Sequence, residues 1–291
     1  MITTLHAPLR KAIRSRYAIP AFNVTNLETA QVVLRAAAKL RSPVIVQTSE
    51  SAIAYAGPET IISMLQTLSA ELAPHVPVVT HLDHGKHFHV AERCVTLGYT
   101  SIHMDASERP WSQNVAVTRR AVVLGHRRRI TVQGELGYLL GYEGMTKINF
   151  DRRKLKALMT DPDQAAAFVA ATGVDTLAIA VGTAHGFFRG KEKIDFERLA
   201  AIQKKVSVPL VLHGGSGVSD AEIQRAIRTG IRIINLDTAL RIHFLNGIQQ
   251  AMALYDPKAL VDIRTVMDAA QRSMTREAER LIKLVGSALQ A

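Results

Sequence analysis

Short apolar runs rich in Val and Ile alternate with longer segments of mixed polarity along this chain of 291 residues. Each run is bounded by Pro, Gly or polar residues, which is the pattern of a short buried strand. The clearest run, Val78–Gly85, follows Pro77 and ends in Asp-His-Gly. We predict eight such strands, at residues 18–23, 43–49, 78–85, 100–105, 130–135, 176–181, 208–213 and 231–236.

The segments between these runs have the spacing of amphipathic helices. Three of them also carry a capping residue, and we predict helices at 27–40 after Asn26, at 164–171 after Asp161 or Asp163, and at 220–229 after Ser219. Strands that alternate with helices build parallel sheets through right-handed crossovers.

Eight strand–helix units match a closed (β/α)8 TIM barrel, a fold of about 250 residues. An open, doubly wound sheet is the alternative, but residues 23–26 after the first strand lack the glycines of a dinucleotide-binding turn. We expect one domain over residues 1–291. Its helical extension, from about 257 to 291, would cover the barrel or contact another subunit.

Composition narrows the cellular setting. No run of about 18 apolar residues predicts a membrane span, and residues 1–6 do not resemble a secretory signal. The single cysteine, Cys94, excludes an internal disulfide and fits the reducing cytoplasm. We therefore expect a cytoplasmic protein that makes no membrane contact.

The net charge of +11 raises the alternative of a nucleic-acid partner. The basic residues are scattered along the chain, however, and aromatic residues make up only 5% of it. A stacking surface for bases is therefore not indicated, and we predict no nucleic-acid partner. The positive charge fits attraction of a phosphorylated substrate instead.

Polar side chains stand at nearly every predicted strand end. In a barrel of this type the C-terminal ends of the strands form one mouth, which carries the active site. The residues placed there are Asn23, Ser49, Asp83 with His84, Asp105, Glu135, His185, His213 and Asn235.

Three of these residues, His84, His185 and His213, predict a divalent metal site. Three imidazoles from separate strands can hold a zinc ion and leave a fourth position open for catalysis. Asp105 and Glu135 are candidate supporting or alternative ligands, which leaves room for a second divalent ion. The competing pair in His87-Phe88-His89 falls at a helix start, so we expect these two rings to diverge on the surface. His81 is expected to be a core or barrel-lining residue.

Two loops have the composition of a phosphate site. Residues 214–217, Gly-Gly-Ser-Gly, follow the seventh strand, and residues 235–238 follow the eighth, which is the usual phosphate position in this fold. A third loop, 182–189, contributes Arg189, whose guanidinium can clamp a phosphate.

Five ordered motifs together resemble the class II, metal-dependent fructose-bisphosphate aldolases, most closely the branch with tagatose-bisphosphate aldolases. They are VVTHLDHG at 78–85, QGELG at 133–137, VGTAHGFFRG at 181–190, VLHGGSG at 211–217 and INLDT at 234–238. The resemblance implies reversible cleavage of fructose 1,6-bisphosphate to dihydroxyacetone phosphate and glyceraldehyde 3-phosphate.

The resemblance also implies roles for individual residues. His84, His185 and His213 match the zinc ligands. Asp83 matches the acid that protonates the aldehyde oxygen, Glu143 the carboxylate that moves the proton at the dihydroxyacetone carbon, and Asn235 the residue that stabilises the enediolate. The positions that match dihydroxyacetone-phosphate binding are Gly186, Gly214, Ser216, Asp237 and Thr238. A monovalent cation, Na⁺ or K⁺, is implied beside this phosphate.

Several alternatives stay open. Asn23 and Ser49 are generic donors near the aldehyde half, so the sequence does not separate fructose from tagatose 1,6-bisphosphate or another phosphorylated ketose. No lysine stands at a strand end, which disfavours a Schiff-base mechanism. A barrel that only binds sugar phosphates is the non-enzymatic alternative. As the assembly we expect a homodimer or homotetramer.

Overall fold

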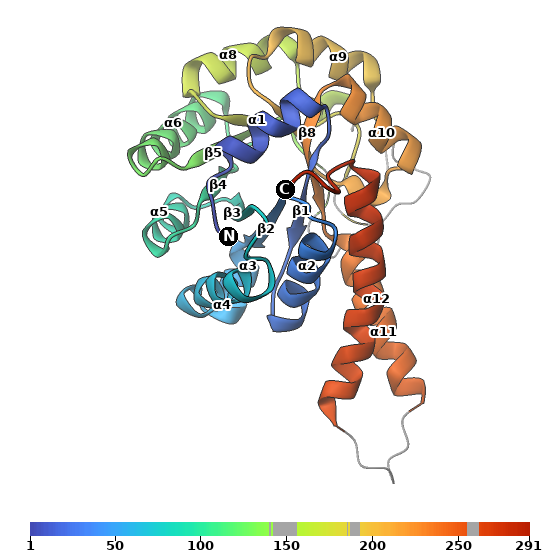
Figure 1. Ribbon diagram of the computed structural model, residues 1–291. Helices are drawn as coiled ribbons and strands as arrows, with labels where there is room; N and C mark the ends of the chain where they lie inside the picture. The colour runs from blue at the N-terminus through green and yellow to red at the C-terminus, as the bar shows by residue number, and fades with distance from the viewer. Residues whose placement is uncertain (140, 142–155, 185, 187–192, 255–261) are drawn as a thin grey trace.

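The structure, a computed structural model, describes residues 1–139, 141, 156–184, 186, 193–254 and 262–291. Its strands form one closed barrel in chain order, and all neighbouring pairs are parallel (Figure 1). The strands are β1 (Ile19–Asn23), β2 (Val44–Ser49), β3 (Val78–Gly85), β4 (Ser101–Met104), β5 (Thr131–Leu136), β6 (Thr176–Ile179), β7 (Leu210–Leu212) and β8 (Ile231–Leu236).

Helices surround this barrel and connect its strands (Figure 1). They are α1 (His6–Ser15), α2 (Leu27–Lys39), α3 (Glu50–Ala56), α4 (Pro58–Leu72), α5 (Phe88–Leu97), α6 (Trp111–Arg127), α8 (Pro162–Thr172), α9 (Phe196–Lys205), α10 (Asp220–Thr229), α11 (Thr238–Ala253) and α12 (Ile263–Leu284). A short 3₁₀ turn, η1 (Gly215–Gly217), follows β7.

The barrel closes between the first strand and the last. Ile19 pairs with Ile233, and Phe22 pairs with Leu236. The predicted (β/α)8 barrel is therefore confirmed, and the open-sheet alternative is wrong. All eight predicted strands are present, and their ends lie within two residues of prediction; β7 begins after Pro209, which has no N–H to donate to a ladder.

Side-chain caps fix the helix starts that the sequence predicts. Asn26 and Thr29 form a reciprocal capping box on α2. Asp161 accepts hydrogen bonds from the first turn of α8, and Ser219 accepts the Glu222 N–H of α10. Asp161, rather than Asp163, is thus the cap of α8.

The barrel interior changes from apolar at one end to polar at the other. Helix α1 and the residues that flank it pack against the inward side chains at the N-terminal ends of the strands. This cluster comprises Leu5, Leu9, Ala12, Tyr17, Ile19, Ala21, Ile45, Val79, Ala178, Val211 and Ile233. With that end filled by hydrocarbon, the polar chemistry is confined to the opposite mouth.

Helices α11 and α12 pack against each other and extend well beyond the barrel (Figure 1). Helix α12 also packs along α2, where Lys39 pairs with Glu279 at 2.8 Å. It occupies most of the predicted C-terminal helical extension. None of the described helices is long and apolar enough to cross a membrane.

Candidate active site

The strand ends meet at one buried carboxylate. Asn23 Nδ2 donates to Asp83 Oδ2 at 2.8 Å, and Asn235 Nδ2 donates to Asp83 Oδ1 at 3.2 Å. Gln47 Nε2 donates in turn to Asn23 Oδ1 at 2.6 Å. These bonds join β1, β2, β3 and β8, and they hold both oxygens of a side chain that is only 2% exposed. The predicted convergence of Asn23, Asp83 and Asn235 is confirmed.

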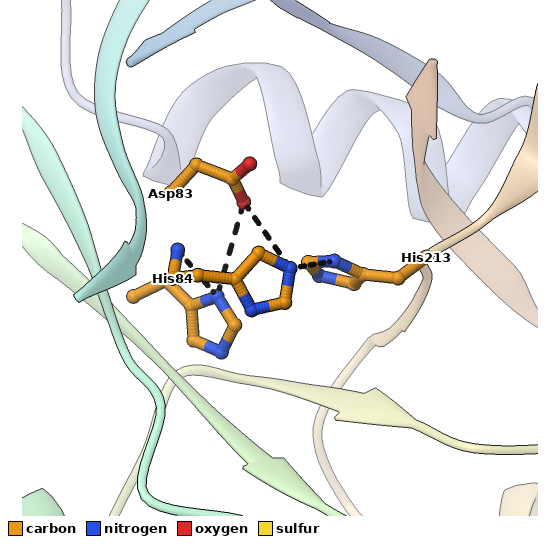
Figure 2. Close-up of side chains that lie close together, drawn as sticks. Asp83, His84 and His213 are labelled. Carbon is orange, nitrogen blue, oxygen red and sulfur yellow. Dashed lines mark hydrogen bonds and ion pairs between the residues drawn. The ribbon is translucent and has the colours of Figure 1, made fainter. Parts of the chain in front are cut away.

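A bulge at the end of β3 turns two consecutive side chains into the mouth. Alternation along a strand would send His84 to the outer face if Asp83 points inward. His84 instead has a left-handed backbone with φ of 44°, and the β3–β4 register shifts between Leu82 and Gly85. Asp83 and His84 therefore both face the barrel axis, as Figure 2 shows.

Gly85 makes this bulge possible. A Cβ atom added at Gly85 would lie 2.7 Å from the backbone oxygen of His103 and 2.7 Å from Leu82 Cδ2. Only a residue without a side chain lets β3 approach β4 this closely.

Two predicted metal ligands face each other across the mouth. His84 Nε2 lies 2.9 Å from His213 Nδ1 (Figure 2). The other nitrogen of His84, Nδ1, is 2.7 Å from Asp105 Oδ2, so in the neutral ring it donates its proton there and leaves Nε2 with a lone pair. A carboxylate behind the imidazole is the usual support of a metal-binding histidine. His213 is held by Thr183, which donates to its carbonyl oxygen at 2.8 Å.

The two remaining carboxylates of the site lie on the far side of His84. Glu135 Oε2 is 3.7 Å from His84 Nδ1, and Ser107 Oγ donates to Asp105 Oδ1 at 2.7 Å. The side chains that could bind a metal form two groups that share His84. One group is Asp83, His84, His103 and His213, and the other is His84, Asp105 and Glu135.

The charge balance at this site favours a bound cation. Burial disfavours a charged imidazolium at His84, yet the charges of Asp83, Asp105 and Glu135 raise its pKa to about 10. Burial and the charge of Asp105 raise the pKa of Glu135. The three buried carboxylates therefore stabilise a positive charge at His84, either a proton or a metal ion. Buried nitrogen and oxygen donors of this kind fit Zn²⁺ or a similar divalent ion.

A pocket beside the metal-ligand set contains most of the predicted phosphate-binding residues. It is lined by Asn23, Asp83, Gly186, His213, Gly214, Ser216, Asn235, Asp237 and Thr238. The N-terminus of α11 opens onto it, and the Ala239 N–H donates to Ser216 Oγ at 3.2 Å. Backbone N–H groups at a helix start attract anions.

Backbone contacts bring the loops after β6 and β7 together at this pocket. Gly214 has a left-handed backbone, and a Cβ atom added there would lie 2.3 Å from the Ala184 backbone oxygen. Asp237 pairs with Arg241 at 2.6 Å. Burial raises the pKa of Asp237, while the Arg241 charge opposes that shift.

Ser49 belongs to the mouth but not to the phosphate pocket. It accepts the Ala52 N–H as the cap of α3, and its Oγ lies 2.9 Å from Ser51 Oγ. A second cleft contains it, on the side of His84 that faces Asp105. That cleft is lined by Ser49, Glu50, Ser51, His84, Lys86, Asp105, Ser107, Glu108, Glu135, Tyr138, Leu139 and Gly141.

Three residues that the sequence assigned to the site, Glu143, His185 and Arg189, lie outside the described residues. The other histidines are described. His81 is buried and lies 2.8 Å from Ser101 Oγ, as expected of a core residue. His87 and His89 are exposed as predicted, but their ring centroids are 5.6 Å apart, so the expected divergence is wrong.

His103 is a site residue that sequence reasoning missed. Its side chain is fully buried, its Nε2 lies 3.3 Å from Glu135 Oε2, and its ring centroid is 4.9 Å from that of His84. The alternation of side-chain direction along β4 could have identified it, because His103 comes two residues before Asp105 and therefore lies on the same inner face.

Comparison with known proteins identifies the family. The YdjI aldolase from Escherichia coli K12 is 32% identical over 100% of both chains, with a TM-score of 0.86. A fructose-bisphosphate aldolase from Campylobacter jejuni shares the fold at 22% identity and a TM-score of 0.80, over 100% of this chain and 97% of that one. The family model of class-II fructose-bisphosphate aldolase matches residues 3–290. The chain therefore belongs to the class II fructose-bisphosphate aldolase family.

Proposed function

We propose that this protein is a metal-dependent aldolase that reversibly cleaves a ketose phosphorylated at C1, releasing dihydroxyacetone phosphate and an aldehyde. The observation that supports it best is the position of Asp83. Its carboxylate, fixed by Asn23 and Asn235, borders both the facing nitrogens of His84 and His213 and the pocket at the start of α11.

Within this proposal His84, His213 and His185 hold a zinc ion. Asp105 and Glu135 orient His84 or serve a second divalent ion. A zinc ion bound here would act as a Lewis acid on the ketose oxygens and ease the build-up of negative charge when the carbon–carbon bond breaks.

Asp83 acts as the proton carrier at the C4 oxygen. The charges of His84 and His213 outweigh burial and keep the pKa of Asp83 well below its usual range. In the cleavage direction the carboxylate accepts the C4 hydroxyl proton as the C3–C4 bond breaks. In the synthetic direction Asp83 returns that proton to the aldehyde oxygen. Glu143 moves the proton at C3, and Asn235 donates a hydrogen bond to the charge that develops there.

The phosphate at C1 binds in the pocket between the loops after β6, β7 and β8. Gly186, Gly214, Ser216 and Thr238 supply N–H and hydroxyl donors, and Arg189 adds a guanidinium. Asp237 would repel a phosphate if it faced it alone. Its pairing with Arg241 offsets that repulsion, and a Na⁺ or K⁺ ion beside the phosphate would offset it further.

Fructose 1,6-bisphosphate is the first candidate substrate, but the second cleft favours another. Its described lining holds Glu50, Glu108 and the cation Lys86, and Lys86 is already paired with Glu108 at 2.8 Å. A second phosphate would meet two carboxylates there. A ketose with its only phosphate at C1 is therefore the alternative substrate. Tagatose 1,6-bisphosphate, the C4 epimer of fructose 1,6-bisphosphate, is a further candidate.

We also propose that the protein forms a cytoplasmic homodimer or homotetramer. Large apolar side chains on the projecting α11–α12 pair support an assembly, since Leu245, Leu254 and Ile263 are 62%, 87% and 71% exposed. Light scattering after size-exclusion chromatography tests this; a particle with the mass of a single chain contradicts it.

Product formation tests the proposed activity. Dihydroxyacetone phosphate release is followed from fructose 1,6-bisphosphate, tagatose 1,6-bisphosphate and fructose 1-phosphate in parallel, before and after chelator dialysis and zinc addition. We expect release from at least one ketose, its loss on dialysis and its return with zinc. Cleavage that resists the chelator contradicts the metal mechanism, and phosphate binding without turnover of any ketose indicates a sugar-phosphate-binding barrel instead.

A further inference from the structure

The bulge in β3 directs a backbone N–H group toward the side chains of the barrel interior. His84 has the left-handed backbone described above, so its N–H donates to His103 Nδ1 at 3.3 Å. A buried N–H needs an acceptor, or the conformation that buries it becomes costly. His103 on β4 supplies that acceptor.

This bond determines which nitrogen of His103 carries a proton. Because Nδ1 accepts, the proton of the neutral ring is on Nε2. That nitrogen lies 3.3 Å from Glu135 Oε2, a carboxylate oxygen on β5. The imidazole of His103 therefore spans from the backbone of His84 to the side chain of Glu135, and it is fully buried.

His103 also packs against both of the metal-facing rings. Its centroid lies 4.9 Å from that of His84 and 5.2 Å from that of His213. Its Nδ1 accepts the His84 N–H and its Nε2 lies 3.3 Å from Glu135 Oε2, whereas His84 Nε2 and His213 Nδ1 point at each other. His103 is thus placed to orient the ligands rather than to act as one.

We propose that His103 is a positioning residue of the metal centre. By accepting the His84 N–H it holds the left-handed conformation that turns His84 away from the outer face of the barrel, and through Glu135 it ties that bulge to β5. This assignment rests on the proposed function, because it assumes that His84 and His213 bind a divalent ion.

The test measures Co²⁺ binding, since this ion gives a visible spectrum that reports ligand geometry. His103→Leu removes both polar contacts. In His103→Asn the amide oxygen occupies nearly the position of Nδ1 and restores the acceptor for the His84 N–H. His81→Leu is the matched control, because His81 is a buried histidine on β3 whose described hydrogen bond goes to Ser101.

We expect His103→Leu to weaken Co²⁺ binding by about 10- to 100-fold, as the loss of a supporting contact does, and to alter the ligand-field spectrum. His103→Asn should recover most of the affinity and the spectrum. His81→Leu should lower Tm yet bind Co²⁺ as the unaltered protein does. This readout separates positioning from a general loss of stability.

Two results overturn the assignment. One is His103→Leu binding Co²⁺ with unchanged affinity and spectrum; the other is equal weakening in His103→Leu and His103→Asn. If the protein without substitutions binds no Co²⁺, the proposed metal centre itself is wrong. That result differs from the first one above, in which both this protein and His103→Leu bind Co²⁺ equally well.

Discussion

His84 Nε2 and His213 Nδ1 lie 2.9 Å apart although 129 residues separate them in the chain. β3 and β7 are not neighbours in the barrel, so the pair meets across the mouth. The contact requires both the closed barrel and the bulge that turns His84 inward.

Replacing His213 by alanine should abolish zinc binding. The substitution removes one of the two facing imidazole nitrogens, so the zinc ion loses one of its ligands. Zinc content measured by mass spectrometry should fall to background, and cleavage should fall with it. His126→Ala is the control, because His126 is half-exposed and contacts Asp175 away from the mouth. Equal zinc content in the two variants would refute the ligand assignment.

Asp83→Asn should lower kcat by about 10² to 10⁴, the usual contribution of a positioned proton-transfer group. The amide has nearly the shape of the carboxylate, so the phosphate pocket should persist and KM should change little. Steady-state kinetics together with zinc content check this. A kcat within threefold of the unaltered protein would show that another group carries the proton.

Ser216→Ala should raise KM for the phosphorylated substrate about tenfold or more, since hydrogen bonds to charged groups contribute about 1.5–3 kcal/mol. Ser219→Ala, at the cap of α10, is the matched control. It should cost about 1 kcal/mol of stability and leave KM unchanged. If the Ser216 variant keeps its KM, the phosphate does not bind at this pocket.

Gly85→Ala should destabilise the protein by about 1–3 kcal/mol, the usual cost of overpacking. The new methyl group would meet the His103 backbone oxygen and Leu82, each at 2.7 Å. Urea unfolding measures the loss of stability, and zinc content should fall with it because the bulge must shift. Unchanged stability would mean that β3 relaxes freely at this point.

Glu108→Gln should distinguish the two substrate candidates. It frees Lys86 from its 2.8 Å ion pair and removes one carboxylate from the second cleft. With a bisphosphate, kcat/KM should rise by a few-fold, since an exposed pair contributes about 0.2–1 kcal/mol. With a ketose 1-phosphate it should stay constant. A bisphosphate response no larger than that of the monophosphate would show that no phosphate reaches Lys86.

The barrel was predictable because each strand is a separate apolar run between turn residues, and Asp83, His213 and Asn235 followed from the rule that strand ends form the mouth. The bulge was not predictable in the same way. Alternation along Val78–Gly85 places His84 outside, and the bulge at which Gly85 packs against β4 reverses that orientation.

His103 escaped prediction because it lies inside a strand, between the buried apolar residues Ile102 and Met104, instead of at a strand end. Its role depends on a hydrogen bond to the bulge, which the sequence does not encode locally. The sequence also did not predict that the α11–α12 pair extends beyond the barrel (Figure 1), because amphipathic spacing identifies a helix but not its direction relative to the barrel.

The most direct measurement is hydrogen exchange at C3 of dihydroxyacetone phosphate in D₂O, followed by NMR. This half-reaction needs only the metal-ligand set, the phosphate pocket and a proton carrier, and it does not depend on which aldehyde the protein accepts. We expect deuterium at a single C3 position with the zinc-loaded protein and none after chelator dialysis or with His213→Ala. Exchange that persists without the metal, or no exchange with zinc present, would contradict the proposed metal-dependent mechanism.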